Sequence, residues 1–265
     1  MTTVAVLGLG EAGSLIARDL VRAGLTVRGW DPDLHGDLSE IPIAPNHRAA
    51  VEGADVVISV NWAIVAEQVA RDTVPFLGSG KIFADHNTAG PALKAKLAEI
   101  VEPTGAHFVD VAMMSPVPPV GIKVPMFLAG SGAEEYAAFL RPLGTPIGFV
   151  GSRAGEAIAR KLCRSVYYKG FAAVICEALE AARAVGVEDW LRSDITKSFT
   201  EADEGTLTRM VEGTRKHAKR RAHELEDAAA MLEELGVLPI TARATATALH
   251  SIAEQAKGDD LVRAR

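Results

Sequence analysis

The residues with the clearest chemical potential in this 265-residue sequence form a glycine-rich turn near its start. A short apolar run, Val4 to Leu7, leads directly into the pattern G-x-G-x-x-G, and a helical pattern begins within that turn and continues to Ala23. A strand, such a turn and a helix N-terminus together present backbone N–H groups and partial positive charge to a pyrophosphate. The pattern therefore predicts a dinucleotide-binding turn made of Gly8, Leu9, Gly10, Glu11, Ala12 and Gly13.

The three glycines have separate tasks in a turn of this kind. Gly8 permits the tight turn, Gly10 lets the backbone approach the pyrophosphate, and Gly13 lets the helix pack closely on the strand. The next strand-like run ends in Asp31, whose carboxylate can accept hydrogen bonds from ribose hydroxyls and would repel a 2′-phosphate. We therefore expect NAD as the cofactor, with NADP as an alternative because Arg28 lies nearby. A glycine turn that binds no dinucleotide is the other interpretation, and it is disfavoured because the strand, the turn, the helix and Asp31 occur together.

The elements that must hold this turn alternate along residues 1–150. Strand-like runs are separated by helical stretches, which predicts right-handed crossovers and a Rossmann-type, doubly wound, mainly parallel sheet in an α/β domain. The expected strands are 4–7, 25–30, 55–60, 81–84, 108–112, 124–129 and 147–150, and the expected helices between them are 11–23, 64–74 and 91–101.

The sequence changes character after Gly151, where glycine becomes sparse and alanine, leucine, glutamate and arginine dominate. Long apolar periodicities without internal proline predict helices over 154–185, 188–199, 204–235 and 241–256. We therefore expect a second, all-α domain over residues 151–265. In so short a chain, the apolar surface of a long helix needs a second subunit to bury it, which predicts a homodimer.

With these motifs the sequence resembles the β-hydroxyacid dehydrogenase family, which includes the 6-phosphogluconate and 3-hydroxyisobutyrate dehydrogenases. The resemblance covers nearly the whole chain. Within the family, the run from Lys161 to Gly170 is similar to a branch in which arginine and serine follow the lysine. The segments that carry the resemblance, besides the glycine turn, are 59–61, 85–88, 110–115 and 155–165.

The resemblance implies an NAD(P)-dependent oxidoreductase that moves a hydride between the nicotinamide and a small hydroxy acid or a related alcohol or oxo compound. Lys161 would be the acid/base residue, because burial beside a cofactor can lower the pKa of a lysine toward neutrality. Ser165, one helical turn further on, would orient it or hold the substrate. The resemblance assigns Val60, Asn61, Asn87 and Thr88 to the cofactor, and Met114, Ser115, Arg164 and His223 to the substrate.

The sequence departs from the family pattern at three places. Met114-Ser115-Pro116 replaces S-G-G. Since proline has no N–H to donate, a substrate carboxylate must be bound by contacts that differ from those of the family. Ser165 replaces an asparagine, and His223-Glu224 stands where the family has lysine and aspartate. The reaction class is therefore better defined than the substrate. Two alternatives stay open: an imine reductase on the same scaffold, and a non-catalytic NAD-binding redox sensor.

The remaining features exclude several other classes. A net charge of −6 gives no attraction to nucleic acid or to anionic membranes, and no uncharged apolar run approaches the ~18 residues that would cross a bilayer. The basic run 215–223 is flanked by acidic residues and is typical of a solvated helix face, although it could also reach an anionic substrate. We expect no metal site, no signal peptide, and a reducing, cytoplasmic location in which Cys163 and Cys176 stay unpaired.

Overall fold

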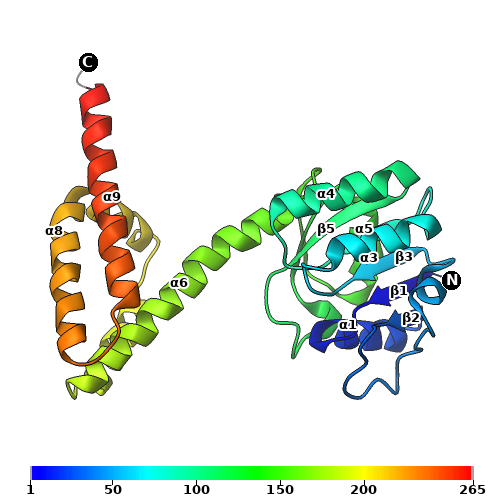
Figure 1. Ribbon diagram of the computed structural model, residues 1–265, viewed down its shortest axis with the longest axis horizontal. Coiled ribbons are helices and arrows are strands. Elements are labelled where there is room, and N and C mark those ends of the chain that lie inside the picture. The colour runs from blue at the N-terminus through cyan, green and yellow to red at the C-terminus, as the bar shows by residue number, and fades with distance from the viewer. Residues whose placement is uncertain (1, 264–265) are drawn as a thin grey trace. The chain divides into compact units, whose positions relative to one another are not determined.

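The structure, a computed structural model, describes residues 2–263, with the side chains of 257–263 excepted. It consists of two compact units that divide between Arg164 and Ser165. Strands β1 to β7 and helices α1 to α5 belong to the first unit, and helices α7 to α9 belong to the second (Figure 1). Helix α6 (Glu156–Ala184) begins in the first unit and ends in the second. Strand β7 ends at Gly151, before α6 begins.

The first unit is built on one seven-stranded sheet with the strand order β2-β1-β3-β4-β5-β6-β7. All neighbouring strands are parallel except β5 and β6, which run antiparallel, so the predicted mainly parallel sheet is confirmed. The strands are β1 (Thr3–Leu7), β2 (Thr26–Trp30), β3 (Val56–Ser59), β4 (Ile82–Asp85), β5 (His107–Met113), β6 (Met126–Ala129) and β7 (Ile147–Gly151).

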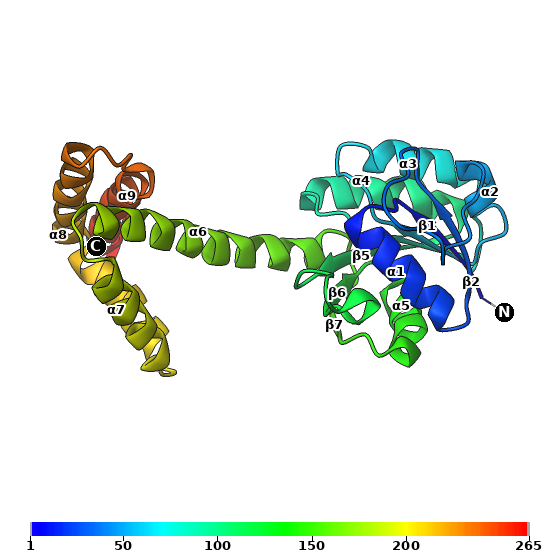
Figure 2. The ribbon, with the colours of Figure 1, turned by 90° about the horizontal axis from the view of Figure 1, so that it is seen from below.

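Helices cover both faces of the sheet, as Figure 2 shows. Because successive side chains of a strand point to opposite faces, Val4 and Val6 of β1 join one apolar core while Ala5 and Leu7 join another. The first core includes residues of α1 (Glu11–Arg22) and α5 (Ala133–Leu140). The second includes residues of α2 (His47–Val51), α3 (Ala66–Thr73) and α4 (Pro91–Val101). The predicted doubly wound architecture is therefore confirmed.

The strand order reverses direction at β1, because β2 pairs with one side of β1 and β3 with the other. In open parallel sheets, ligands bind beyond the carboxyl ends of the strands at such a switch point. Short 3-10 turns connect several elements of this unit: η1 (Val74–Phe76), η2 (Glu102–Thr104), η3 (Gly121–Lys123) and η4 (Arg141–Leu143). The helices α2 and α5 were not expected from the sequence.

The second unit is entirely helical in the part that the structure describes, which confirms the predicted all-α region. After α6 come α7 (Glu188–Thr200), α8 (Thr206–Glu234) and α9 (Ile240–Arg263). Helices α8 and α9 pack against each other, and Ala222 of α8 and Ala246 of α9 are buried. One feature departs from the expected continuous helix: His217 has non-helical dihedral angles (φ −119°, ψ 15°) and bends α8.

None of the described helices has the length and apolar character that spanning a membrane requires. In the same part of the chain, His, Cys, Asp and Glu side chains form no group that could hold a metal ion. Cys163 and Cys176 are both exposed and unpaired.

Candidate functional site

The glycine turn lies directly after β1, and two of its glycines are required by steric contacts. Gly8 has a φ of 101°, and a Cβ atom there would come within 2.1 Å of the carbonyl oxygen of Val60. A Cβ on Gly13 would come within 1.9 Å of the carbonyl oxygen of Gly8, so the helix can approach the turn only without a side chain at this position. A Cβ on Gly10, in contrast, would meet nothing within 4 Å. The space beside Gly10 is therefore open.

This open space faces the start of α1. Gly10 is the N-cap residue of α1, and no side chain caps the helix. The first amides of an uncapped helix offer N–H groups and partial positive charge to an anion. The turn, the open space and the uncapped helix thus fit the pyrophosphate of a dinucleotide.

Asp31 follows β2 and is hydrogen-bonded to the turn itself. Its Oδ2 accepts a hydrogen bond of 2.7 Å from the backbone N–H of Leu9, and its Oδ1 accepts one of 2.9 Å from the backbone N–H of Asp33. The carboxylate is half-buried. Since each carboxylate oxygen can accept more than one hydrogen bond, both retain capacity for a ribose hydroxyl.

Arg28 lies on β2, and its guanidinium is already hydrogen-bonded. Its Nη1 donates to the carbonyl oxygens of Ala49 and Glu52, at 3.4 and 2.6 Å. Glu52 is the C-cap residue of α2, so Arg28 satisfies carbonyl groups at the end of that helix. Arg28 is thus engaged in holding α2 to the sheet.

A second group of polar residues follows the neighbouring strands β3 and β4. The side-chain oxygen of Asn87 accepts a hydrogen bond of 2.5 Å from the backbone N–H of Asn61. The amide nitrogen of Asn87 donates to Oδ1 of Asp85 at 2.6 Å and to Oδ1 of Asn61 at 3.0 Å. Asn61 also donates to Ser59 Oγ at 3.0 Å. The predicted cofactor residues Asn61 and Asn87 therefore form one network at the carboxyl edge of the sheet.

The same edge receives Lys161 from the first part of α6. Its Nζ donates a hydrogen bond of 2.9 Å to Oγ1 of Thr88, the residue after Asn87. Lys161 is half-buried, and Thr88 is exposed. One turn later, Nη1 of Arg164 donates a 2.8 Å hydrogen bond to the carbonyl oxygen of Met114. Two pairs of predicted site residues are thus in contact: Lys161 with Thr88, and Arg164 with Met114.

The start of α6 is held in place by Asp110 of β5. Its Oδ2 accepts hydrogen bonds of 3.0 to 3.1 Å from the backbone N–H groups of Gly155, Ala157 and Ile158. Its other oxygen lies 3.3 Å from Nζ of Lys94, a fully buried lysine of α4. Sequence reasoning did not assign a role to Lys94. The only available signal was a lysine on the buried stripe of a helix.

His86 is also buried at this edge. Its Nε2 lies 2.8 Å from the hydroxyl of Tyr136, and the two rings meet edge to face. Burial, followed by the charges of Lys94 and Lys161, lowers the pKa of His86 to about 3, so its ring is neutral. Burial likewise raises the pKa of the Tyr136 hydroxyl. His86 thus packs beneath the site as a neutral group.

The other predicted substrate residues have different surroundings. Ser115 is exposed, and its hydroxyl donates a long hydrogen bond of 3.5 Å to the carbonyl oxygen of Pro116. Ser165 is the first residue of the second unit. His223 belongs to α8, where its Nδ1 lies 3.0 Å from a carboxylate oxygen of Glu226.

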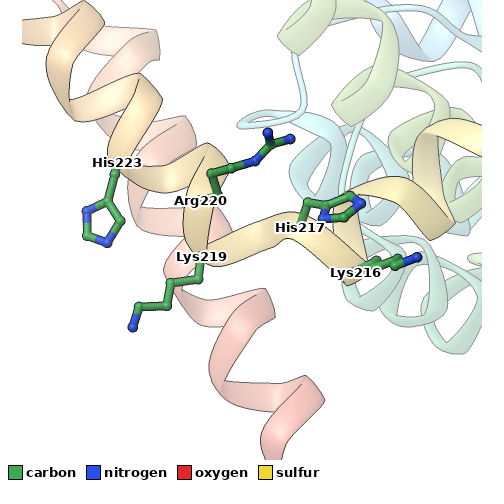
Figure 3. Close-up of a pocket in the computed structure, with 5 residues that line it drawn as sticks. All are labelled: Lys216, His217, Lys219, Arg220 and His223. Atoms are coloured by element: carbon green, nitrogen blue, oxygen red, sulfur yellow. The ribbon is translucent and has the colours of Figure 1, made fainter.

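The basic run of α8 surrounds a shallow hollow of about 430 Å³ in the second unit. Its lining comes from helical turns on both sides of the bend at His217, as Figure 3 shows. Glu224 lies 3.6 Å from Arg220, while no described carboxylate pairs with the other two cations, Lys216 and Lys219. The lining residues are Lys216, His217, Lys219, Arg220 and His223.

Comparison with known protein families identifies the chain. Residues 3–137 match the family described as the NAD binding domain of 6-phosphogluconate dehydrogenase. The chain belongs to this family. Its members are NAD-dependent dehydrogenases and reductases of the hydroxyacid dehydrogenase type, so the resemblance seen in the sequence is confirmed. Residues 182–252 match a second family, a domain of unknown function named DUF1932.

Individual relatives agree with this assignment. The mitochondrial 3-hydroxyisobutyrate dehydrogenase of Homo sapiens is 26% identical over 206 residues, which cover 73% of this chain and 61% of that enzyme. A conserved hypothetical protein of Sinorhizobium meliloti is 31% identical, with a TM-score of 0.62, over 94% of this chain and 88% of that one. The imine reductase of Myxococcus stipitatus, solved with NADP⁺, shares the fold at 20% identity and a TM-score of 0.77, over 96% and 95% of the two chains.

Proposed function

We propose that this protein is an NAD-dependent oxidoreductase that transfers a hydride between the nicotinamide and a small hydroxy acid or a related alcohol or oxo compound. The single observation that carries the proposal is the 2.9 Å hydrogen bond from Lys161 to Thr88. It places an ammonium group beside the Asn61 and Asn87 network, at the carboxyl edge of the same sheet from which the glycine turn leaves β1. This arrangement supports a proton-coupled hydride transfer at that edge.

Lys161 is the acid/base group in this proposal. The nicotinamide, when bound, supplies or accepts the hydride, and a proton must leave or join the substrate oxygen in the same reaction. In the oxidation direction, the neutral amine of Lys161 takes the hydroxyl proton; in reduction, its ammonium returns a proton to the carbonyl oxygen. Thr88 fixes the position of the Nζ atom, and Asn61 and Asn87 border the cofactor on the same side.

The cofactor in this proposal is NAD rather than NADP. Asp31, Asp33 and Asp37 place three carboxylates in the segment that follows β2, and these would repel a 2′-phosphate. Arg28, the nearest candidate for a phosphate partner on β2, is hydrogen-bonded to the end of α2. The fold itself accepts both cofactors, since Myxococcus stipitatus imine reductase has been solved with NADP⁺ and, as a variant, with NAD⁺.

The substrate is held by residues that differ from the usual pattern of the family. Arg164 shares a hydrogen bond with the carbonyl oxygen of Met114, and together with Ser115 these residues border the substrate. Ser165, one helical turn beyond Lys161, completes the proposed set on α6, and His223 on α8 stays a prediction from the sequence. The guanidinium of Arg164 gives a small carboxylate substrate its charge partner.

The test is a substrate panel monitored by the absorbance of the reduced nicotinamide, with NAD and NADP in parallel. Hydroxy acids of three to six carbons with NAD⁺, and the matching oxo acids with NADH, should give turnover. Turnover of cyclic imines alone would instead identify an imine reductase. Tight NADH binding without turnover on any member of the panel would contradict the proposed activity and favour a redox sensor.

We also propose that the protein is a homodimer. Apolar and aromatic side chains along α6 and α7 are exposed, and two of them, Tyr167 and Phe171, stack on each other with ring centroids 6.0 Å apart. Exposed apolar surface of this extent marks an interaction site. Sedimentation equilibrium should give a mass of twice 28.0 kDa, and Phe171→Glu should shift the protein toward the monomer. A wild-type protein that is monomeric at micromolar concentrations would contradict the proposal.

A further inference from the structure

Lys94 is the most deeply buried cation of the first unit, with no exposed side-chain surface. Its Nζ has three oxygen neighbours: the backbone carbonyl of Asp85 at 2.7 Å, Oδ2 of Asp85 at 2.6 Å, and Oδ1 of Asp110 at 3.3 Å. The backbone carbonyl of Asp85 accepts a hydrogen bond from this ammonium group, and the two carboxylate oxygens form ion pairs with it. Asp85 and Asp110 are register partners on the adjacent strands β4 and β5, which explains why both carboxylates reach one lysine.

Each of these two carboxylates has a second oxygen that is bonded to a different part of the candidate site. Oδ1 of Asp85 accepts a hydrogen bond from Asn87, which in turn accepts one from the backbone N–H of Asn61. Oδ2 of Asp110 accepts hydrogen bonds from backbone N–H groups at the start of α6, the helix that carries Lys161. Lys94 therefore lies between the Asn61 and Asn87 network and the helix that carries Lys161, and contacts a carboxylate bonded to each.

The contacts form a closed circuit. It runs from Lys161 to Thr88, through the adjacent Asn87 to Asp85, then through Lys94 to Asp110, and along the first turns of α6 back to Lys161. We propose that Lys94 is a positioning residue. Through Asp110 it fixes the start of α6 and so the position of Lys161 relative to the substrate, and through Asp85 it fixes the positions of Asn61 and Asn87. This inference rests on the proposed function of Lys161.

A purely stabilising role would explain these contacts less well. Burying a lysine and two carboxyl groups away from water is costly, and apolar residues of similar volume often give a protein of equal or greater stability. A core built only for stability has no need of Lys94 and its two carboxylates. What such a cluster does provide is fixed direction, because its hydrogen bonds join Lys94 to the backbone carbonyl of Asp85, Asn87 to the Asp85 carboxylate, and the start of α6 to Asp110. Each of the two carboxylates is also hydrogen-bonded to a part of the candidate site, Asp85 to Asn87 and Asp110 to the start of α6.

The experiment compares Lys94→Met with Lys96→Met. Lys96 is on the same helix, but its side chain is about half exposed and pairs with Glu67 at the surface, so its variant is a matched control. Lys94→Met should lower kcat by about 100-fold, as expected for a displacement of roughly 1 Å in a catalytic group, and should change the NADH dissociation constant less than threefold. Lys96→Met should leave both values unchanged. A kcat within threefold of wild type for folded Lys94→Met would overturn the proposal.

Removal of Lys94 alone leaves two buried carboxylates and could prevent folding. The double variant Lys94→Met/Asp85→Asn removes one positive and one negative charge, and keeps Asp110 at the start of α6. We expect this variant to fold, to bind NADH through the glycine turn, and to show the same loss of kcat. A folded double variant with wild-type kcat would contradict the proposed positioning role.

Hydrogen exchange separates this inference from the proposed function. In Lys94→Met or the double variant, the amides of Gly155, Ala157 and Ile158 should exchange at least tenfold faster than in wild type, and in Lys96→Met they should not. This comparison requires no substrate, so it remains decisive if the wild-type protein turns over nothing on the panel. Unchanged exchange at these three amides would overturn the role of Lys94 whatever the activity.

Discussion

The carboxylate of Asp31 accepts a hydrogen bond of 2.7 Å from the backbone N–H of Leu9. The residue proposed to select the cofactor is therefore also a structural part of the glycine turn. Its two roles can be separated by substitution, because an asparagine still accepts this hydrogen bond while an alanine does not.

Asp31→Asn should shift the cofactor preference while leaving the turn intact. Loss of the negative charge removes the repulsion of a 2′-phosphate, so we expect the ratio of NADPH to NADH affinity to rise about tenfold or more, equivalent to about 1.4 kcal/mol. Asp31→Ala should weaken both cofactors, because the N–H of Leu9 loses its partner. Isothermal titration calorimetry on the three proteins measures these values. Equal ratios in wild type and Asp31→Asn would contradict the assignment.

Gly10 and Gly13 offer a matched pair of substitutions. Gly13→Ala places a methyl group 1.9 Å from the carbonyl oxygen of Gly8, and should lower the free energy of unfolding by about 1 to 3 kcal/mol. Gly10→Ala meets no atom within 4 Å and should change stability by less than about 0.5 kcal/mol. The methyl group would, however, occupy the space proposed for the pyrophosphate. We therefore expect Gly10→Ala to unfold in urea like wild type and to bind NADH at least tenfold more weakly; wild-type affinity would exclude a dinucleotide from that space.

Lys161→Ala should abolish most of the turnover without removing cofactor binding. General acid/base catalysis contributes about 10² to 10⁴ in rate, and kcat should fall by that factor. Thr88→Val removes only the hydroxyl that accepts from Nζ, so its loss should be smaller, at about tenfold. Arg160→Ala, an exposed neighbour on α6, is the control. Steady-state kinetics and NADH titrations decide the matter: unchanged turnover in Lys161→Ala with intact binding would exclude the acid/base role.

His86 should make the protein sensitive to acid. Its pKa is lowered from 6.5 to about 3 by burial and by Lys94 and Lys161, so below pH 6.5 the unfolded chain binds a proton that the folded chain does not. Stability should therefore fall as the pH drops from about 6.5 toward 3, with a contribution of up to about 1.4 kcal/mol per pH unit. Urea unfolding between pH 4.5 and 7.5 should show a shallower slope for His86→Gln.

The sequence was sufficient to predict most of the fold. Strands with β-branched apolar runs and helices with long periodicities were found because each signal is local; helix α4, for example, has the predicted bounds of Pro91 and Val101. Helices α2 and α5 are too short to show a clear period. The bend at His217 and the antiparallel pairing of β5 with β6 have no local pattern in the sequence that would predict them.

The candidate site likewise has residues that the sequence predicts and one that it does not. The glycine turn is contiguous in sequence and was recognised from its own spacing, while Lys161 and Thr88 were assigned through a family resemblance. Lys94 was missed because its partners, Asp85 and Asp110, come together only through the register of two strands. The sequence pattern of a helix does not distinguish such a buried lysine from a solvent-exposed one, because the strand pairing that brings its partners together is not visible there.

The engagement of Arg28 limits how this scaffold could bind NADP in place of the proposed NAD. Its guanidinium satisfies carbonyl groups at the end of α2, so diverting it to a phosphate would leave those carbonyls without their donor. Arg18 already donates a hydrogen bond of 2.7 Å to the carbonyl oxygen of Asp37, and a variant that adopts the phosphorylated dinucleotide should add further cations in the segment 32–37. Laboratory evolution toward that cofactor should accordingly accumulate its arginines there, and keep residue 28 as it is.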